Sequence, residues 1–513
     1  MLVKTFAAAV NGISATIITI EVSCTKGIQF FLVGLPDVAV RESHERIISA
    51  LQVNGYQFPR SRIIINMAPA DIRKEGSAYD LPLAIGIMAA AGDIDATLLD
   101  KYMLMGELSL DGSLQPVKGA LPIAIKAREE GFKGFILPKQ NAYEAAVVDK
   151  LEILGVENIK DVIEFFRGKN RLEPTIVNTR DEFFAHQQHF DGDFADVRGQ
   201  ENVKRALEVA AAGGHNIIMI GPPGSGKSML AKRLPSILPP LTLQEALETT
   251  KIHSVAGKIG EHISLLSQRP FRSPHHTISN VAMVGGGSFP QPGEISLAHN
   301  GILFLDELPE FNRNVLEVLR QPLEDRHINI SRARFAVDYP AGFMLVASMN
   351  PCPCGYYNHP TRPCVCPPGA VQKYMNRISG PLLDRIDIQI EIVPVPFEKI
   401  SEQRSSEASA SVRERVIRAR EIQKKRFADE ASLYCNAQMG SKHLHKYAVP
   451  DHAGLSLLKN AMQRLNLSAR AYDRILKLSR TIADLDDSDN IRSCHFAEAI
   501  NYRNLDRESW GLL

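Results

Sequence analysis

The stretch HNIIMIGPPGSGKSMLAKRL, residues 215–234, decides the fold class of this chain. An apolar run comes first, the glycine-rich sequence GPPGSGKS follows, and a helical pattern completes the stretch. Glycines let such a loop curl so that its backbone N–H groups and the N-terminus of the next helix face a phosphate. A plain glycine turn is the alternative, and the flanking patterns argue against it. The stretch therefore predicts an α/β domain of the P-loop type, with a Walker A motif.

The residues expected to bind the nucleotide are those of the loop and the first helical turn: Gly221, Pro222, Pro223, Gly224, Ser225, Gly226, Lys227, Ser228 and Met229. Lys227 is expected to reach the β and γ phosphates, and Ser228 to offer its hydroxyl to Mg²⁺. ATP and Mg²⁺ are therefore the predicted cofactors.

A second motif, NGILFLDELPEF, supplies the carboxylates that phosphate chemistry needs. An apolar run, residues 302–305, precedes Asp306 and Glu307. We expect Asp306 to hold Mg²⁺ through water and Glu307 to orient or polarise the attacking water, because in-line hydrolysis depends on positioned charge. Alone, an Asp-Glu pair after an apolar run is a weak signal, and the upstream loop makes it a strong one.

Two further polar residues are placed for a role at the same site. The apolar run GFMLVASMNP carries Asn350 at its end, where it is expected to contact the γ-phosphate or the lytic water. Arg385, in SGPLLDRIDI, lies at the entrance to a strand. It is either an ion-pair partner of Asp384 or Asp387, or an arginine finger that enters the neighbouring subunit's ATP site. The second interpretation requires an oligomer.

Four of the seven cysteines lie close together, in NPCPCGYYNHPTRPCVCPP at residues 350–368. Exposed loop cysteines beside Pro and Gly have little core to pack into, so we expect a structural Zn²⁺ rather than free packed thiols. The expected ligands are Cys352, Cys354, Cys364 and Cys366, with His359 as a substitute ligand. Pairs of the CxC type are a less specific signal than CxxC pairs. The cluster lies between Asn350 and Arg385, so we expect it to stiffen the connection between them.

Length and composition exclude several classes of protein. A chain of 513 residues predicts two to four domains. An apolar fraction of 44%, a charged fraction of 23% and a net charge of +1 are ordinary for a soluble protein, so any nucleic-acid surface must be local. The sequence shows neither a signal-peptide core nor the roughly 20 apolar residues of a membrane span. We expect a cytoplasmic protein with no membrane partner.

The pattern along the chain predicts three structured parts. Residues 1–165 mix β-branched runs with helical stretches closed by glycine, which predicts an α/β domain. Residues 166–196 lose periodicity and gain charge, so they are interpreted as a linker. Residues 197–397 form the second α/β domain, and residues 398–513 contain helical patterns with one apolar face, which predict a helical bundle.

Taken together, the motifs resemble those of the ComM/YifB family of magnesium-chelatase-like AAA+ ATPases. The resemblance rests on the Walker A motif, on RPFRSPHHTISNVAMVGGGSFPQPGEISLAHNGILFLDELPEF at 269–311 and on SGPLLDRID at 379–387, and it extends over essentially the whole chain. It implies a Lon-protease-like (ribosomal S5 domain 2-like) domain at 1–165, an AAA+ core at 197–397 and a C-terminal helical lid at 398–513. It also implies a homo-hexamer, and the family's association with natural transformation implies a DNA helicase for branch migration, with recombination proteins as further partners.

By position, the resemblance makes Asn350 the sensor 1 residue and Arg385 the arginine finger. Arg470, in LSARAYDR, falls where related helicases keep a sensor 2 arginine; a charge on an exposed helix face is the alternative. The segment at about 271–296 resembles the helix-2 insert of magnesium chelatases and replicative helicases.

A second insert, HINISRARFAVDYPAGF, alternates in polarity and predicts a β-hairpin. In related proteins such hairpins project towards a central channel. Arg332 and Arg334 are two residues apart and so share one face of the strand, where they are expected to meet phosphates of single-stranded or branched DNA. A solvated hairpin edge is the alternative. The basic helix at 411–426 is another candidate for DNA contact, and a solvated face is again the alternative.

A Lon-type fold raises the question of a protease. In APADIRKEGSAYDLPLAIGIMAA the position of the nucleophile falls on Asp80, and the position of the lysine falls near Leu121. A dyad shifted to Ser77 and Lys118 is the remaining alternative, but a nucleophile without an aligned base is not activated. We therefore expect a non-proteolytic domain that serves assembly or DNA contact.

Three functions are thus in view. The first is a hexameric ATP-driven DNA translocase that acts on branched or single-stranded DNA. The second is a chelatase-type motor chaperone that remodels a protein partner. A Lon-like protease is the least favoured of the three.

Overall fold

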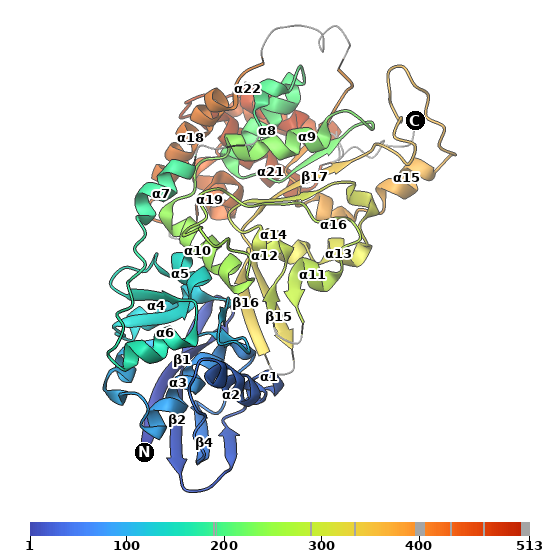
Figure 1. Ribbon diagram of the computed structural model, residues 1–513. Coiled ribbons are helices and arrows are strands. Elements are labelled where there is room, and N and C mark those ends of the chain that lie inside the picture. The colour runs from blue at the N-terminus through green and yellow to red at the C-terminus, as the bar shows by residue number, and fades with distance from the viewer. Residues whose placement is uncertain are drawn as a thin grey trace.

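Two β-sheets organise the chain, one in its first third and one in its centre (Figure 1). The computed structural model describes residues 1–187, 190, 192–287, 290–332, 335–395, 406–430, 433–464 and 467–503. None of the helices within these ranges is both long and apolar enough to cross a lipid bilayer.

The first sheet has seven strands in the order β3-β4-β2-β1-β5-β8-β9. Its strands are β1 (Leu2–Asn11), β2 (Ser14–Thr25), β3 (Phe30–Val33), β4 (Arg62–Ala68), β5 (Tyr102–Leu104), β8 (Gly134–Pro138) and β9 (Glu152–Val156). Strands β1, β2 and β4 pair antiparallel, whereas β5, β8 and β9 continue the sheet in parallel from β1. The β-branched runs of the sequence therefore form the strands that they predict.

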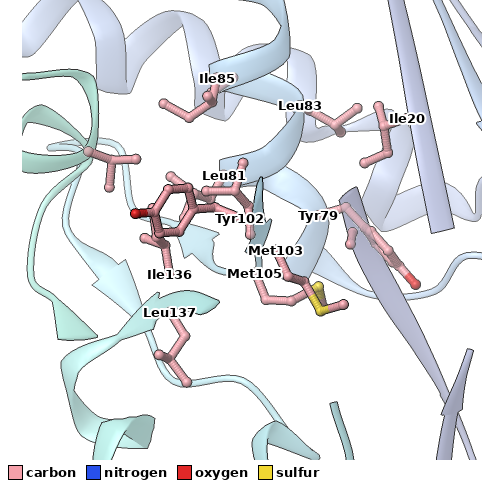
Figure 2. Close-up of a cluster of buried hydrophobic side chains, with 14 of the residues drawn as sticks. Ile20, Tyr79, Leu81, Leu83, Ile85, Tyr102, Met103, Met105, Ile136 and Leu137 are labelled. Carbon is pink, nitrogen blue, oxygen red and sulfur yellow. The ribbon is translucent and has the colours of Figure 1, made fainter. Parts of the chain in front are cut away.

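The helices of this first unit cover the sheet and complete its core. They include α2 (Ser43–Val53), α3 (Asp80–Ala91), α4 (Ala120–Glu129), α5 (Lys139–Ala145) and α6 (Ile159–Phe166). Helix α3 is apolar after Asp80 and is buried from Asp80 to Ala90, as a helix enclosed by protein must be. Figure 2 shows Leu81 and Ile85 of α3 beside Tyr102 of β5 in this core.

The second sheet has five strands in the order β11-β14-β17-β10-β18, and its described pairs are parallel. The strands are β10 (Ile217–Ile220), β11 (Phe271–Arg272), β14 (Ile302–Leu305), β17 (Met344–Met349) and β18 (Ile388–Glu391). Strands β10, β14 and β17 are buried at every position, which explains why each reads as a continuous apolar run.

Alternate residues of each strand pack into different cores. Ile217 and Met219 of β10 belong to the core that includes α8 (Glu201–Gly213), while Ile218 and Ile220 face a core formed largely by residues 283–386. Four helices contribute apolar residues to the second core: α13 (Arg313–Glu317), α14 (Arg320–Asp325), α15 (Ala370–Met375) and α16 (Gly380–Leu383). The sheet is thus the middle layer of three.

The C-terminal helices share the core of the central sheet. They are α18 (Ser409–Arg426), α19 (Ser441–Tyr447), α20 (His452–Arg464), α21 (Ala469–Leu485) and α22 (Ser493–Asn501). Both α18 and α21 pack on α8, and Val416 and Ile475 lie in the same apolar cluster as Ile217. Figure 1 shows this helical layer above the sheet.

The segment expected as a linker is partly helical. Residues 179–186 form α7 (Thr179–His186), which is capped by Asn178. Phe183 of this helix is buried against Leu241 and Leu265, the latter following α10 (Leu243–Val255). One apolar anchor thus gives the segment structure that its charged composition does not predict.

Both inserts are present as structured elements. The first contains α11 (Asn280–Val284), the short strands β12 (Gly285–Gly286) and β13 (Gln291–Pro292), and α12 (Glu294–Leu297). The second is the predicted hairpin, with β15 (His327–Arg332) paired antiparallel to β16 (Phe335–Pro340). Val337 of the hairpin approaches Gly12 of the first unit, where an added Cβ would lie 3.0 Å away.

A buried polar network ties β10 to β18 and α21. Asp387 is 1% exposed, and its Oδ2 lies 3.2 Å from His215 Nδ1, while its Oδ1 lies 2.9 Å from Arg474 Nη1. The backbone N–H of Asn216 also donates to Oδ2. Burial raises the pKa of Asp387, but the charge of Arg474 and the hydrogen bond from His215 outweigh it and hold that pKa well below its usual range.

We predict that Asp387→Asn lowers the free energy of unfolding by about 3–5 kcal/mol, because it leaves Arg474 without its carboxylate partner in a buried site. Because the folded pKa is depressed, the stability that Asp387 contributes is complete above about pH 4 and is lost as the pH falls from there towards the folded pKa. Thermal unfolding from about pH 2 to pH 7, a range that extends below the ordinary carboxylate pKa, measures both effects. Glu157→Gln, which removes the exposed partner of Lys139, is the control and should leave the unfolding temperature unchanged. An Asp387→Asn protein as stable as the wild type would contradict the assignment.

Candidate functional site

The ends of three neighbouring parallel strands bring the predicted site residues together. Strand β17 lies between β10 and β14, with Ile220 opposite Met349 and Leu305 opposite Ala347. Because parallel strands end at the same edge of a sheet, the loop after β10, Asn350 after β17 and Asp306 after β14 meet there. The three motifs, which lie far apart in the sequence, thus form one site.

The loop after β10 is shaped to surround a phosphate. Gly224 and Gly226 have φ angles of 77° and 88°, in the left-handed region that favours glycine. At Gly221 an added Cβ would lie 2.7 Å from the carbonyl oxygen of Ile392, so the close approach of the two segments requires glycine there. Helix α9 (Lys227–Arg233) begins directly after the loop and directs its N-terminus at the same space.

Lys227 is 9% exposed, and its ammonium group is held by the loop itself. Its Nζ donates to the carbonyl oxygens of Gly221 at 2.8 Å and Pro222 at 2.9 Å, and to Asn350 Oδ1 at 3.3 Å. Burial lowers the pKa of Lys227, while Asp306 and Glu307 act in the opposite direction. The contact with Asn350 places the expected sensor 1 residue beside the expected phosphate-binding lysine.

Asp306 and Ser228 form the expected magnesium pair. Ser228 Oγ donates to Asp306 Oδ2 at 2.6 Å, and the hydroxyl of Ser348 donates to the other carboxylate oxygen. Oxygen ligands of this kind are those that Mg²⁺ prefers, with phosphate oxygens and water completing its coordination. The donor set therefore fits the predicted cofactors, ATP and Mg²⁺.

Glu307 turns its side chain towards solvent. The side chain is 57% exposed, and the residue has a φ of 54°, which is uncommon outside glycine and costs on the order of 1–3 kcal/mol. Its Oε2 lies 3.9 Å from Nδ1 of His276, which belongs to the first insert. The insert thus reaches the carboxylate expected to act on water, a contact that neither motif predicts.

A pocket of about 520 Å³ lies beside the phosphate loop. Six of the expected nucleotide-binding residues line it: Pro222, Pro223, Gly224, Ser225, Gly226 and Met229. The remaining walls come from the segment before α8, including Val197 and Gln200, from Pro394 and Val395, and from the loop between the cysteine pairs. These walls carry no motif and only the fold brings them to the loop, so the sequence does not predict them. Such a volume is typical of small-ligand sites.

Arg385 has neither of its two expected ion-pair partners. It is 8% exposed, its Nη2 lies 2.7 Å from Glu324 Oε1 on α14, and its Nη1 donates to the carbonyl oxygen of Pro381 at 2.6 Å. Asp387 is instead occupied by Arg474, and Asp384 by Arg470. The expectation of a pair with Asp384 or Asp387 is therefore wrong. A hollow of about 420 Å³ lies next to Arg385 and is also lined by Glu317 and Asp325.

Arg470 lies in the first turn of α21 and is 66% exposed. Its Nη1 is 3.5 Å from Asp384 Oδ2, a long contact for an exposed ion pair. The described residues that line the nucleotide pocket do not include it. Arg470 thus lies next to Asp384, which precedes Arg385, rather than beside the phosphate loop. Its role as sensor 2 stays a prediction.

The four clustered cysteines converge on one point. Their Sγ atoms all lie within 4.8 Å of one another, with 3.3 Å between Cys352 and Cys354 and 3.5 Å between Cys354 and Cys364; Cys366 completes the group. A tetrahedral zinc with bonds of about 2.3 Å would separate its sulfur ligands by about 3.8 Å. His359 does not belong to the cluster, and its Nδ1 accepts hydrogen bonds from the N–H groups of Thr361 and Arg362.

The candidate DNA contacts receive little support from the structure. Arg332 lies at the tip of the hairpin, opposite Phe335, and Arg334 lies outside the described residues. In the basic helix α18, Arg415 pairs with Glu208 and Glu407, and Arg426 makes two hydrogen bonds to the buried Asp484. Several of its positive charges are therefore used within the protein.

Comparisons with known proteins agree with this site. The model for magnesium chelatase, subunit ChlI, matches residues 193–400; models for subunit ChlI of Mg-chelatase and for the C-terminal part of that subunit match 20–141 and 406–503.

The chain is 45% identical to the uncharacterized protein YifB of Salmonella typhimurium over 504 residues, which cover 97% of this chain and 96% of that protein. It is 45% identical to YifB of Escherichia coli over 508 residues, with coverages of 97% and 96%. It is 43% identical to the competence protein ComM of Haemophilus influenzae over 505 residues, with coverages of 98% and 97%. The chain therefore belongs to the magnesium chelatase ChlI-like family, with an AAA+ domain at its centre.

Proposed function

We propose that this protein is a hexameric, ATP-dependent DNA translocase that promotes branch migration when incoming DNA recombines during natural transformation. Membership in an AAA+ family implies ATP hydrolysis. The main observation in support of an ATP-driven function is that four expected site residues lie together at one edge of the central sheet: Lys227, Ser228, Asp306 and Asn350. The similarity to ComM over nearly the whole chain supports the role in competence.

The residues of the site have separable tasks in hydrolysis. Lys227 binds the phosphates and, with Asn350, fixes their position. Ser228 and Asp306 would hold Mg²⁺, which when bound would supply positive charge to offset that of the phosphates. Glu307 projects into solvent at a strained backbone position, where it can orient the attacking water. The site is thus built for positioning and charge stabilisation, which phosphoryl transfer mainly requires.

We also propose that the four clustered cysteines hold a structural Zn²⁺. The Sγ separations are close to those of tetrahedral coordination and far from the length of about 2.05 Å that a disulfide requires. Four protein ligands leave no open position, so the metal would not take part in catalysis.

For the first unit, we propose a Lon-type domain without peptidase activity. Asp80, at the position of the nucleophile, is fully buried, and its carboxylate accepts two hydrogen bonds from Arg46 at 2.7 Å and 2.8 Å. Leu121 is also fully buried. Lys118, of the shifted dyad, directs its Nζ to Gln291 in the first insert, and its alkyl chain covers Gly257. These contacts support a role for the lysine in packing between the two units rather than in a dyad with Ser77.

A second candidate is a chelatase-type motor chaperone that remodels a protein partner. The three family models that match the chain are all models of magnesium chelatase subunit ChlI. Such a protein would hydrolyse ATP at the same site but would respond to a protein rather than to DNA. The two candidates therefore differ in what stimulates the ATPase.

We predict that Lys227→Ala weakens binding of ATP by at least about tenfold, because the phosphates lose a buried cationic donor. Glu307→Gln should bind ATP as the wild type does and lose nearly all turnover. Binding is measured with a fluorescent ATP analogue, and turnover by phosphate release. If Glu307→Gln hydrolysed ATP at the normal rate, its assigned role would be wrong.

Arg385→Ala is predicted to leave nucleotide binding intact while lowering turnover by roughly 10³–10⁵, the range that arginine fingers contribute. In the structure Arg385 is held by Glu324 of its own subunit, so Glu324→Gln is the matched control: it removes the pair, keeps the arginine, and should retain turnover. Mixing Arg385→Ala with Lys227→Ala subunits tests action across the interface. Equal turnover in Arg385→Ala and the wild type would exclude a finger at this position.

The translocase proposal is tested by measuring ATP hydrolysis with single-stranded, duplex and branched DNA at low and high salt. We expect branched or single-stranded DNA to stimulate hydrolysis, and the same preparation to move a three- or four-way junction. The Glu307→Gln variant controls for passive melting of the junction. Hydrolysis that ignores DNA, together with an inability to move either junction, would reject the translocase and favour the motor chaperone.

A further inference from the structure

The loop between the two cysteine pairs forms a wall of the subunit's own nucleotide pocket. Tyr356, His359, Thr361 and Arg362 line the pocket together with residues 222–226 of the phosphate loop. These four residues all lie between Cys354 and Cys364. The cysteine cluster therefore adjoins the ATP site directly, rather than only connecting Asn350 to Arg385.

The root of this loop is packed on the phosphate loop. Gly355 is buried and has a φ of 83°, and an added Cβ would lie 2.5 Å from Cδ of Pro223. Both the backbone angle and the close contact require glycine at this point. The two loops thus touch immediately after the first cysteine pair.

The conformation of the loop between Cys354 and Cys364 depends on how its two ends are held. Its described backbone hydrogen bonds are short-range, such as Gly355 N–H to the carbonyl oxygen of Cys352 at 3.0 Å and His359 N–H to that of Tyr356 at 3.2 Å. The cysteine pairs bracket the segment, and their sulfur atoms converge on one point. A metal bound there closes the loop and removes much of its conformational freedom. Without the metal, the loop loses this closure and is held less firmly against the pocket.

Arg362 is the positively charged residue with which this loop lines the pocket. Its guanidinium lies 5.3 Å from the ring centroid of Tyr356, and its Nη1 donates to the Tyr356 hydroxyl at 3.0 Å. His359 Nδ1 accepts from the backbone N–H of Arg362 at 3.1 Å and so fixes the turn that carries it. The side chain is exposed at the rim of a pocket that also contains Ser225 and Gly226. A planar guanidinium held in this way suits the oxygens of a phosphate chain.

We propose that Arg362 binds the phosphates of the nucleotide in its own subunit, and that zinc at the four cysteines sets nucleotide affinity by holding this wall in place. The proposal rests on the function proposed above, because it assumes that the pocket binds ATP. It gives the metal a regulatory consequence: loss of zinc to a chelator would lower the affinity of the protein for its nucleotide.

The test is nucleotide binding by the full-length protein, measured by titration calorimetry with a non-hydrolysable ATP analogue and with adenosine. Zinc content is determined on the same samples. We expect Arg362→Ala to weaken binding of the ATP analogue about ten- to hundredfold, the range for a hydrogen bond to a charged group, with adenosine little affected. Arg167→Ala is the matched control, because it removes a similar stack, 4.9 Å from the ring centroid of Tyr56 in the first unit, and should bind like the wild type.

Zinc removal is the second arm of the test. Chelated protein that remains folded by circular dichroism should lose affinity at least as much as Arg362→Ala does, and should regain it when zinc is restored. Unchanged affinity in both Arg362→Ala and folded zinc-free protein would overturn the proposal, as would zinc content near zero in protein purified without chelators. A wild-type protein that does not bind the ATP analogue would instead reject the proposed function itself.

Discussion

The buried carboxylate of Asp387 is the charge on which the arrangement of the central region depends. It contacts His215, which precedes β10, and Arg474 of α21, and it lies two residues from Arg385. Asp387 therefore connects three parts of the structure: the strand that leads into the phosphate loop, the turn that carries Arg385, and the C-terminal helices. A buried charge that loses its partner is costly, so these three parts are held in one relative position. The same network includes Asn216, whose side chain joins β17 to the Arg385 backbone through hydrogen bonds of 2.9 Å each.

Much of the nucleotide site could be predicted from sequence, because its key residues follow continuous apolar runs. A buried parallel strand has that appearance, and the residue after it necessarily lies at the edge of the sheet. This reasoning correctly brings Lys227, Asp306 and Asn350 together, and the family comparison confirms the AAA+ assignment. The hairpin could also be predicted, since strict alternation of polarity is typical of strands with one buried face.

The remaining features depend on contacts between distant segments, which no local pattern records. Arg385 pairs with Glu324, although two aspartates flank it in the sequence, because β18 directs Asp387 into the core. The apolar Phe183 gives structure to a segment whose charge indicated a linker. Similarly, seven basic residues make α18 resemble a DNA-binding surface, yet Arg415 and Arg426 are committed to carboxylates within the protein. In each case a contact between distant segments determines the role of the residue, and composition alone does not predict that contact.

The contacts of Lys227 have a consequence for nucleotide affinity. Its ammonium group has four oxygen acceptors: two carbonyls and the Ser225 hydroxyl of its own loop, and the side chain of Asn350. A nucleotide must replace these contacts, so part of its interaction energy is spent in exchanging one set of partners for another. Because the loop itself satisfies the ammonium group, the net affinity that Lys227 contributes to phosphate is smaller than its charge alone would suggest.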